Sequence, residues 1–270
     1  DLHSFPTRRS SDLSFIGLCL FRVATIQAEL ETAYGSDCRA SVGKCHPVCH
    51  LSHYGILLSG CHPVTLHPIR MAKKISVIIV SYNVCQLLDE CLQSVERALD
   101  GVESDIFVVD NRSTDHTVET LRPKHPQVNF IANPTNVGFA SANNQAIRRS
   151  DAEYVLLLNP DTVVYEPTIK GCLDFMDQHP EAGGAGVRML TREGKPARES
   201  RRAIPTPWVS MLKMLGFTRR YYMSNLPWDQ PGRIEVVSGA YCLLRRKALD
   251  QVGLLDEDFF MYGEDIDLSY

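Results

Sequence analysis

The densest group of acidic residues lies near the end of the chain, between Asp256 and Asp267. Large apolar residues at 259–262 interrupt it, which a purely solvated acidic face would not need. Burial beside apolar side chains raises the proton affinity of a carboxylate, as a general base requires. Glu264 and Asp265 are therefore candidates for proton abstraction. The alternative is that Glu264 only caps a helix that begins near Asp265.

A second acidic candidate follows the apolar run 154–158, in the tripeptide Asn159-Pro160-Asp161. Magnesium and manganese are held in proteins by one or two carboxylates, with substrate phosphates and water as the remaining ligands. Asp161 could hold such a cation, which would act as a Lewis acid on a departing diphosphate. The alternative is an ordinary turn, because Asn, Pro and Asp all favour turns.

Asp110 ends another apolar run and precedes a predicted helix. A carboxylate in this place can accept hydrogen bonds from a base edge or from ribose hydroxyls, or it can cap the helix. No glycine-rich dinucleotide fingerprint follows the first apolar run, and the chain has no Walker-type phosphate loop. A dinucleotide-binding fold is therefore disfavoured.

These residues are positioned by alternating strands and helices from Ile75 to Gln178. β-Branched apolar runs predict buried strands, and apolar residues at helical spacing predict helices between them. The alternation predicts a mainly parallel α/β sheet with helices on both faces. The predicted strands are 75–81, 105–110, 128–132 and 154–158, and the predicted helices are 84–99, one capped by Ser113 or Thr114, 140–149, and one with Pro167 in its first turn.

Polar side chains follow all four predicted strands. Ligands of parallel sheets bind at the carboxyl ends of the strands, where these side chains would meet. Any one of them could be a turn residue, but the four groups together indicate a site. The groups are Ser81-Tyr82-Asn83, Asp110-Asn111, Asn133-Pro134-Thr135-Asn136 and Asn159-Pro160-Asp161.

The remainder of the chain carries three further patterns. Residues 236–244 predict a strand with a glycine turn, followed by a helix. The basic, proline-containing tract 192–207 fits a solvated surface loop better than a phosphate contact. Residues 208–222 are amphipathic, which fits either a membrane surface or burial in the core.

Composition excludes some function classes. The chain has 270 residues and a formal net charge of −4, so a nucleic-acid partner is not expected. It has no apolar run of the roughly 18 residues that a membrane span needs. The four cysteines after Met71 are scattered, as in proteins of a reducing compartment, which predicts a cytoplasmic location.

The first seventy residues differ from the rest. They hold five of the nine cysteines and six of the nine histidines, and residues 45–62 raise the alternative of a zinc site. The start, 4–13, resembles read-through of a sequencing adapter, and Met71 opens what looks like a natural start. We predict that residues 1–70 are disordered or artefactual and lie outside the domain formed by 71–270.

The motifs after Met71 resemble the family 2 glycosyltransferases of the GT-A fold, and most of all the bacterial branch that includes rhamnosyltransferases. They occur in the family's order over nearly all of 75–270. They are Val77–Asn83, Val108–Ser113, Asn136–Ala140 with Asn143-Asn144, Leu158–Asp161, Ser238-Gly239-Ala240 and Phe259–Leu268.

The resemblance implies a role for each motif. Asp161 would bind Mg²⁺ or Mn²⁺, although Asn159 stands where many relatives carry a first carboxylate. Asp265 would be the base of an inverting single displacement, with Glu264 as the second candidate. The nucleotide-sugar site would comprise Ser81, Tyr82, Asn83, Asp110, Asn111, Asn136, Gly138, Asn143 and Asn159, and the acceptor side Ser238, Gly239 and Ala240.

The resemblance also implies the partners. The expected donor is a dTDP- or UDP-linked sugar, with rhamnose favoured, and the expected acceptor is a cell-surface glycan or a lipid-linked glycan. The location would be cytoplasmic, with peripheral contact at the inner face of the cell membrane. Relatives continue beyond the position of Tyr270, often with a histidine that completes the metal site, so this chain is expected to be weakly active or inactive. The alternative is a non-catalytic module that binds sugar nucleotides or glycans.

Overall fold

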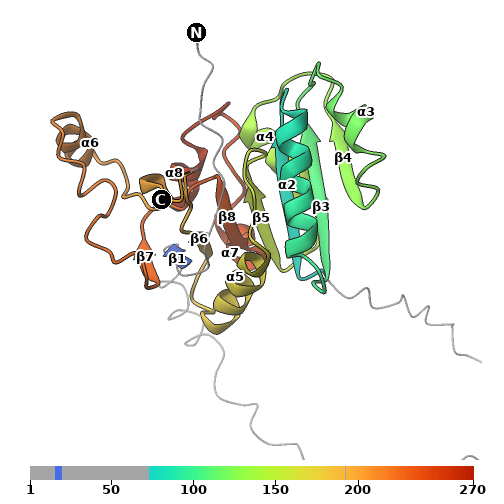
Figure 1. Cartoon of the computed structure of the whole chain (residues 1–270). Helices are drawn as coiled ribbons and strands as arrows, with labels where there is room; N and C mark the ends of the chain where they lie inside the picture. The colour runs from blue at the N-terminus through green and yellow to red at the C-terminus, as the bar shows by residue number, and fades with distance from the viewer. Residues whose placement is uncertain (1–15, 20–72, 192) are drawn as a thin grey trace, which may run out of the picture. The chain divides into compact units, whose positions relative to one another are not determined.

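The computed structural model of the chain describes residues 16–19, 73–191 and 193–270 (Figure 1). The zinc alternative at 45–62 lies outside these ranges, and so do all of residues 1–70 except 16–19. Residues 16–19 form strand β1 (Ile16–Cys19), which pairs antiparallel with β6 (Gly184–Val187) and parallel with β7 (Gly232–Ile234).

The first half of the sheet consists of parallel strands. β2 (Ile75–Ser81) pairs with β3 (Ser104–Asp110) on one side and with β5 (Tyr154–Leu158) on the other, and β4 (Val128–Ala132) pairs with β3. Every residue of β2 and β5 is buried, as their continuous apolar runs predict. All four predicted strands are confirmed.

The second half of the sheet is largely antiparallel. β8 (Tyr241–Arg245) lies between β5 and β6 and pairs antiparallel with both. The strand predicted from Val236 begins only at Tyr241, and Val236 forms an isolated bridge with Arg202. The sheet order is β4-β3-β2-β5-β8-β6-β1-β7. The predicted α/β class with a mainly parallel sheet is thus confirmed, with antiparallel pairings on one side.

Helices cover both faces of the sheet, as predicted (Figure 1). Helices α2 (Cys85–Ala98) and α5 (Glu166–Gln178) pack on the face of Ile75, Val77 and Ile79. Helices α4 (Phe139–Ile147) and α7 (Arg246–Val252) pack on the opposite face. Each helix packs one apolar stripe against the sheet. This packing holds in place the strands whose carboxyl ends carry the candidate site residues.

The short helix α3 (Thr117–Leu121) corrects one prediction. It begins three residues after Thr114, so neither Ser113 nor Thr114 caps it. The Asp115 carboxylate accepts the backbone N–H of Thr117 instead, at 3.2 Å. Ser113 and Thr114 lie in the loop before the helix and bond to Asn83.

The chain leaves the sheet between β6 and β7. It forms the 3-10 helix η1 (Arg198–Ser200) and helix α6 (Pro207–Met214), which lies away from the sheet in Figure 1. The last helix, α8 (Glu264–Ser269), carries the acidic motif. Within the described residues, no helix has the length and apolar character to cross a membrane.

Candidate active site

Two buried polar atoms lie at the carboxyl ends of β2 and β3. Ser81 and Asp110 are partners in the strand register, and the Ser81 carbonyl accepts the N–H of Asn111 at 2.8 Å. The Asp110 side chain is 4% exposed, and its Oδ2 accepts the Ser113 N–H at 2.9 Å. Asp110 Oδ1 and Ser81 Oγ have no hydrogen-bond partner among the described residues. Buried polar atoms are rarely left unpaired, so these two fit a ligand.

The loop after β2 is held by Asn83. This residue has a positive φ of 55°, and its Oδ1 accepts the N–H of Thr114 at 2.7 Å. Its own N–H donates to Ser113 Oγ at 2.9 Å. Asn83 therefore shapes the rim of the site through protein contacts, while the neighbouring Tyr82 ring is 52% exposed.

The predicted amide side chains bind the backbone around them. Asn111 Nδ2 donates to the Gly138 carbonyl at 3.1 Å, and the Gly138 N–H donates to Asn136 Oδ1 at 3.0 Å. Asn143 is buried, and its Nδ2 donates to the Phe139 carbonyl within α4 at 2.9 Å. These three residues brace the loop at Gly138, and a direct contact of each with the nucleotide sugar stays a prediction.

Gly138 brings this loop against the acidic motif of the last helix. Its φ is 84°, and a Cβ added there would lie 2.6 Å from the Phe260 carbonyl oxygen. The same carbonyl accepts the Phe139 N–H at 2.8 Å. Only glycine fits this contact without strain, because L residues disfavour such φ values and the Cβ would clash with backbone.

The turn after β5 joins the predicted metal residue to the acceptor-side segment. The Asn159 N–H donates to the Ala240 carbonyl at 3.2 Å, and the Asn159 carbonyl accepts Thr162 Oγ1 at 2.8 Å. Asp161, on the same turn, is half-buried. Three clustered metal-ligating side chains do not occur in the part of the chain that the structure describes. The carboxylate of Asp161 and the amide of Asn159 fit Mg²⁺ or Mn²⁺ when substrate phosphates complete the coordination.

Glu264 is the first residue of α8 and is 7% exposed. Its Oε2 is buried without a hydrogen-bond partner among the described residues. Burial raises the pKa of the Glu264 carboxyl above its ordinary value, and the nearby charge of Asp265 raises it further. The N-cap position belongs to Gly263, so the alternative that Glu264 caps the helix is wrong.

Asp265 is held by two donors. Nη2 of Arg202 forms an ion pair with its Oδ2, and the Gly239 N–H donates to the same atom at 3.4 Å. The side chains of Arg202 and Asp265 are 17% and 16% exposed. Burial lowers the pKa of the Arg202 guanidinium, but the charge and hydrogen bond of Asp265 outweigh this effect and raise it.

The predicted solvated loop 192–207 is therefore wrong at its centre, where Ala197, Ser200 and Ala203 are buried together with the basic residue Arg201. Arg202 reaches Asp265, and Arg201 is buried, with its guanidinium 3.5 Å from the Trp228 ring centroid. The sequence placed Arg202 only in a basic tract, and its pairing with a residue far along the chain left no local pattern. The Gly239 N–H contacts Asp265 of the acidic motif, and the Ala240 carbonyl contacts the turn after β5. The acceptor-side role of Ser238, Gly239 and Ala240 stays a prediction.

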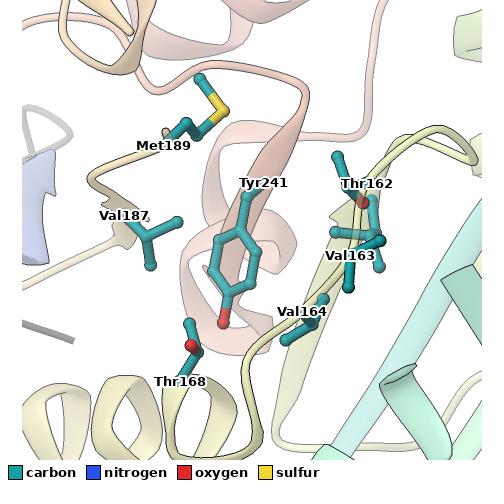
Figure 2. Close-up of a pocket in the computed structure, with 8 residues that line it drawn as sticks. Thr162, Val163, Val164, Thr168, Val187, Met189 and Tyr241 are labelled. Carbon is teal, nitrogen blue, oxygen red and sulfur yellow. The ribbon is translucent and has the colours of Figure 1, made fainter. Parts of the chain in front are cut away.

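An apolar pocket borders the turn after β5, with Thr162 of that turn among its lining residues. Figure 2 shows the Tyr241 ring among side chains from the segment after β5, from α5 and from β6. No carboxylate lines it, and its surface is apolar apart from hydroxyl groups. The lining residues are Leu158, Thr162, Val163, Val164, Thr168, Val187, Met189 and Tyr241.

The chain thus combines a mixed α/β sheet, a polar site at the strand ends and carboxylates from a later segment. The sequence profile described as Glycosyl transferase family 2 matches residues 76–253, so the chain belongs to that family. The chain is similar to the N-acetylglucosaminyl-diphospho-decaprenol L-rhamnosyltransferase of Mycobacterium tuberculosis. The two are 29% identical over 218 residues, which cover 74% of this chain and 70% of the relative.

Other matches agree with this assignment. The low-salt glycan biosynthesis hexosyltransferase Agl10 of Haloferax volcanii is 29% identical over 206 residues, covering 74% of this chain and 62% of that protein. The mannosyltransferase PcManGT from Pyrobaculum calidifontis has a TM-score of 0.50 at 18% identity, covering 74% of this chain and 51% of its own. S. aureus TarS has a TM-score of 0.51 at 20% identity, covering 73% and 32%. The predicted GT-A fold and glycosyltransferase class are confirmed.

Proposed function

We propose that the protein transfers a sugar, with rhamnose as the leading candidate, from a dTDP- or UDP-linked donor to a hydroxyl group of a cell-surface or lipid-linked glycan. The observation that carries the proposal is the contact of the Gly138 loop with Phe260. It links the loop bound by Asn111, the neighbour of Asp110, to the segment just before Glu264 and Asp265.

The proposed donor site is the edge at β2 and β3. Asp110 Oδ1 and Ser81 Oγ are fixed acceptors on rigid strands, suited to a base edge or to ribose hydroxyls. Tyr82, at the exposed rim, offers an aromatic face to the base. The relative from M. tuberculosis is named for L-rhamnose transfer, which supports rhamnose as the first sugar to test.

The proposed metal ligand is Asp161, with Mg²⁺ or Mn²⁺ as the ion. A bound ion of this kind neutralises the charge of a departing diphosphate. Support comes from the half-buried carboxylate at a strand end and from PcManGT, which was solved in complex with GDP-Man and Mn²⁺. Asn159 contributes to the turn through its backbone N–H and carbonyl.

The proposed base is Asp265, with Glu264 as the second candidate. A proton passes from the acceptor hydroxyl to the carboxylate as the hydroxyl oxygen attacks the anomeric carbon, and the bond to the diphosphate breaks on the opposite face. This single displacement inverts the configuration. Gly239 lies beside Asp265 and carries no side chain, which leaves room for the acceptor.

The proposed location is the inner face of the cell membrane, with peripheral contact. The amphipathic segment does not bury its large side chains as one alternative predicted: Trp208, Met214, Leu215 and Phe217 are exposed. Basic residues such as Lys213 and Arg219 accompany them, as in helices that lie on anionic membrane surfaces. The named decaprenol substrate of the M. tuberculosis relative fits such a contact.

A donor screen of the purified chain tests the proposal. dTDP-rhamnose, UDP-N-acetylglucosamine, UDP-glucose and GDP-mannose are each incubated with Mn²⁺, with Mg²⁺ or with chelator, in the presence of a lipid-linked N-acetylglucosamine acceptor. We expect metal-dependent release of dTDP or UDP together with a longer glycan. Tight binding of a nucleotide sugar by calorimetry, without transfer from any donor, would instead support a non-catalytic binding module.

A further inference from the structure

We propose that Arg202 is a positioning residue: it anchors Oδ2 of Asp265 so that Oδ1 receives the proton of the acceptor hydroxyl. This inference rests on the proposed function, since it assigns a division of labour to the two oxygens of the proposed base.

Hydrogen bonds hold the backbone of Arg202 on both sides. The Arg202 carbonyl accepts the Val236 N–H at 3.0 Å, and the next N–H, of Ala203, donates to the Tyr221 carbonyl at 2.8 Å. The Ile204 N–H donates to the Glu235 carboxylate at 2.9 Å. A guanidinium mounted on such a segment keeps its direction, as a group that orients a catalytic carboxylate must.

The bridge between Arg202 and Val236 also aligns the second donor. Three residues after Val236 the chain reaches Gly239, whose N–H donates to Asp265 Oδ2 at 3.4 Å. Arg202 Nη2 binds the same oxygen. Both donors therefore converge on Oδ2, and neither is directed at Oδ1. A carboxylate held by one oxygen presents the other in a fixed direction.

The chemical step follows from this arrangement. The acceptor O–H proton moves to Asp265 Oδ1 while the acceptor oxygen forms a bond to the anomeric carbon, and the electron pair of the broken bond leaves with the diphosphate. Arg202 and the Gly239 N–H hold Oδ2 during the step, so Oδ1 keeps facing the acceptor hydroxyl. Without Arg202 the carboxylate rotates more freely, and fewer encounters have the geometry for proton transfer.

The neighbouring Arg201 has a different role. Its guanidinium packs on the Trp228 ring, and its Nη1 donates to the Pro227 carbonyl at 3.0 Å. Arg201 therefore anchors the segment to the loop before β7, whereas Arg202 extends to the site. The two adjacent arginines therefore have separate roles. Arg201 holds the backbone of the segment, and Arg202 binds Asp265 from that fixed backbone.

The test compares Arg202→Met, Arg202→Lys and the control Arg97→Met, which removes the same charge from an exposed site on α2. We expect Arg202→Met to lower kcat by roughly 10- to 100-fold through misplacement of the base, with the Kd for UDP or dTDP unchanged. Arg202→Lys should restore kcat in part, because it keeps a charged donor but loses the planar guanidinium. Arg97→Met should change none of these.

A further readout separates the failures. The chemical shift of the Asp265 carboxyl carbon, measured by NMR at one pH in labelled protein, is expected to change in Arg202→Met and not in Arg97→Met, even in a chain without turnover. An unchanged shift, or equal kcat in Arg202→Met and Arg97→Met, overturns the inference. A wild-type chain that transfers no sugar, while the shift changes as expected, counts against the proposed function alone. If Arg202→Met does not fold, the shift and the kcat of Arg202→Lys decide.

Discussion

The two halves of the sheet hold their parts of the site in different ways. In the parallel half, β2 and β5 are fully buried, and the side chains of Asn111, Asn136 and Asn143 are hydrogen-bonded to backbone. In the antiparallel half the strands are short, and the acidic motif lies on a six-residue helix.

The loop before that helix is also more open than the donor-side edge. Phe260, Met261 and Tyr262 are exposed, although the Phe260 carbonyl is fixed by Phe139. Binding residues on rigid elements suit a ligand of constant shape, whereas loop residues adapt to variable ones. The difference fits the proposal that the parallel half recognises the nucleotide and that the antiparallel half meets a more variable acceptor.

The largest effect is expected for Asp161→Asn. If Asp161 is the metal ligand, loss of its charge should lower metal-dependent transfer by roughly 100-fold or more, because the departing diphosphate loses its Lewis acid. Steady-state rates over a range of Mn²⁺ concentrations measure this. The control Asp174→Asn removes the same charge from an exposed position on α5. Equal losses in the two variants would remove the metal role from Asp161.

Asp110→Asn should weaken donor binding with little effect on folding. The amide nitrogen can occupy the place of Oδ1, where the ligand needs an acceptor, and hydrogen bonds to a charged group contribute about 1.5–3 kcal/mol. We therefore expect the Kd for UDP or dTDP to rise by roughly 10- to 100-fold in calorimetry. An unchanged Kd would show that the unpaired atom at the end of β3 does not meet the nucleotide.

Gly138→Ala tests the contact between the two halves. Its Cβ would lie 2.6 Å from the Phe260 carbonyl oxygen, so we expect a loss of about 1–3 kcal/mol in the free energy of unfolding. Gly101→Ala is the matched control, since Gly101 has a similar positive φ of 71° but open space around it. Denaturant titration of both variants measures the difference. Equal losses would mean that backbone strain alone accounts for the effect.

The smallest effect is expected for Glu264→Gln. Burial raises the pKa of the Glu264 carboxyl in the folded state, so between 4.5 and that raised pKa the native state binds more protons than the unfolded state. The contribution of this group to stability therefore falls as pH rises through that window. The stability of wild type relative to Glu264→Gln should decline from pH 4.5 upwards in denaturant titrations. A constant difference would indicate that Glu264 ionises as it does in the unfolded chain.

The fold was predictable where short-range patterns decide it. The predicted bounds of the strands 75–81, 128–132 and 154–158 match the structure residue for residue. A continuous apolar run bounded by polar residues defines both ends of such a strand. Strand β6 was not predicted, because the short segment Gly184–Val187 shows no alternation of apolar and polar side chains. Its pairing with β8 holds it in the sheet. Helix α3 starts later than predicted because the loop before it uses Ser113 and Thr114 to hold Asn83.

The site was predictable in outline only. The strand-end positions of Ser81 and Asp110 follow from topology, but the sequence does not show which of their atoms lack partners. Long-range contacts decide the rest: Asn144 bonds to Leu255 across 111 residues, and Arg202 reaches Asp265 across 63. Such pairs leave no local pattern, so the sequence could not place an arginine beside the proposed base.

Asp265→Asn tests most directly the separation of donor binding from catalysis. The substitution keeps the shape of the side chain and removes its basicity, and Asp265 lies in the antiparallel half. We predict that the Kd for the donor, measured by calorimetry with Mn²⁺, is unchanged within about twofold, while sugar transfer falls by at least about 100-fold. Transfer at the wild-type rate, or loss of donor binding in parallel with transfer, would contradict this account.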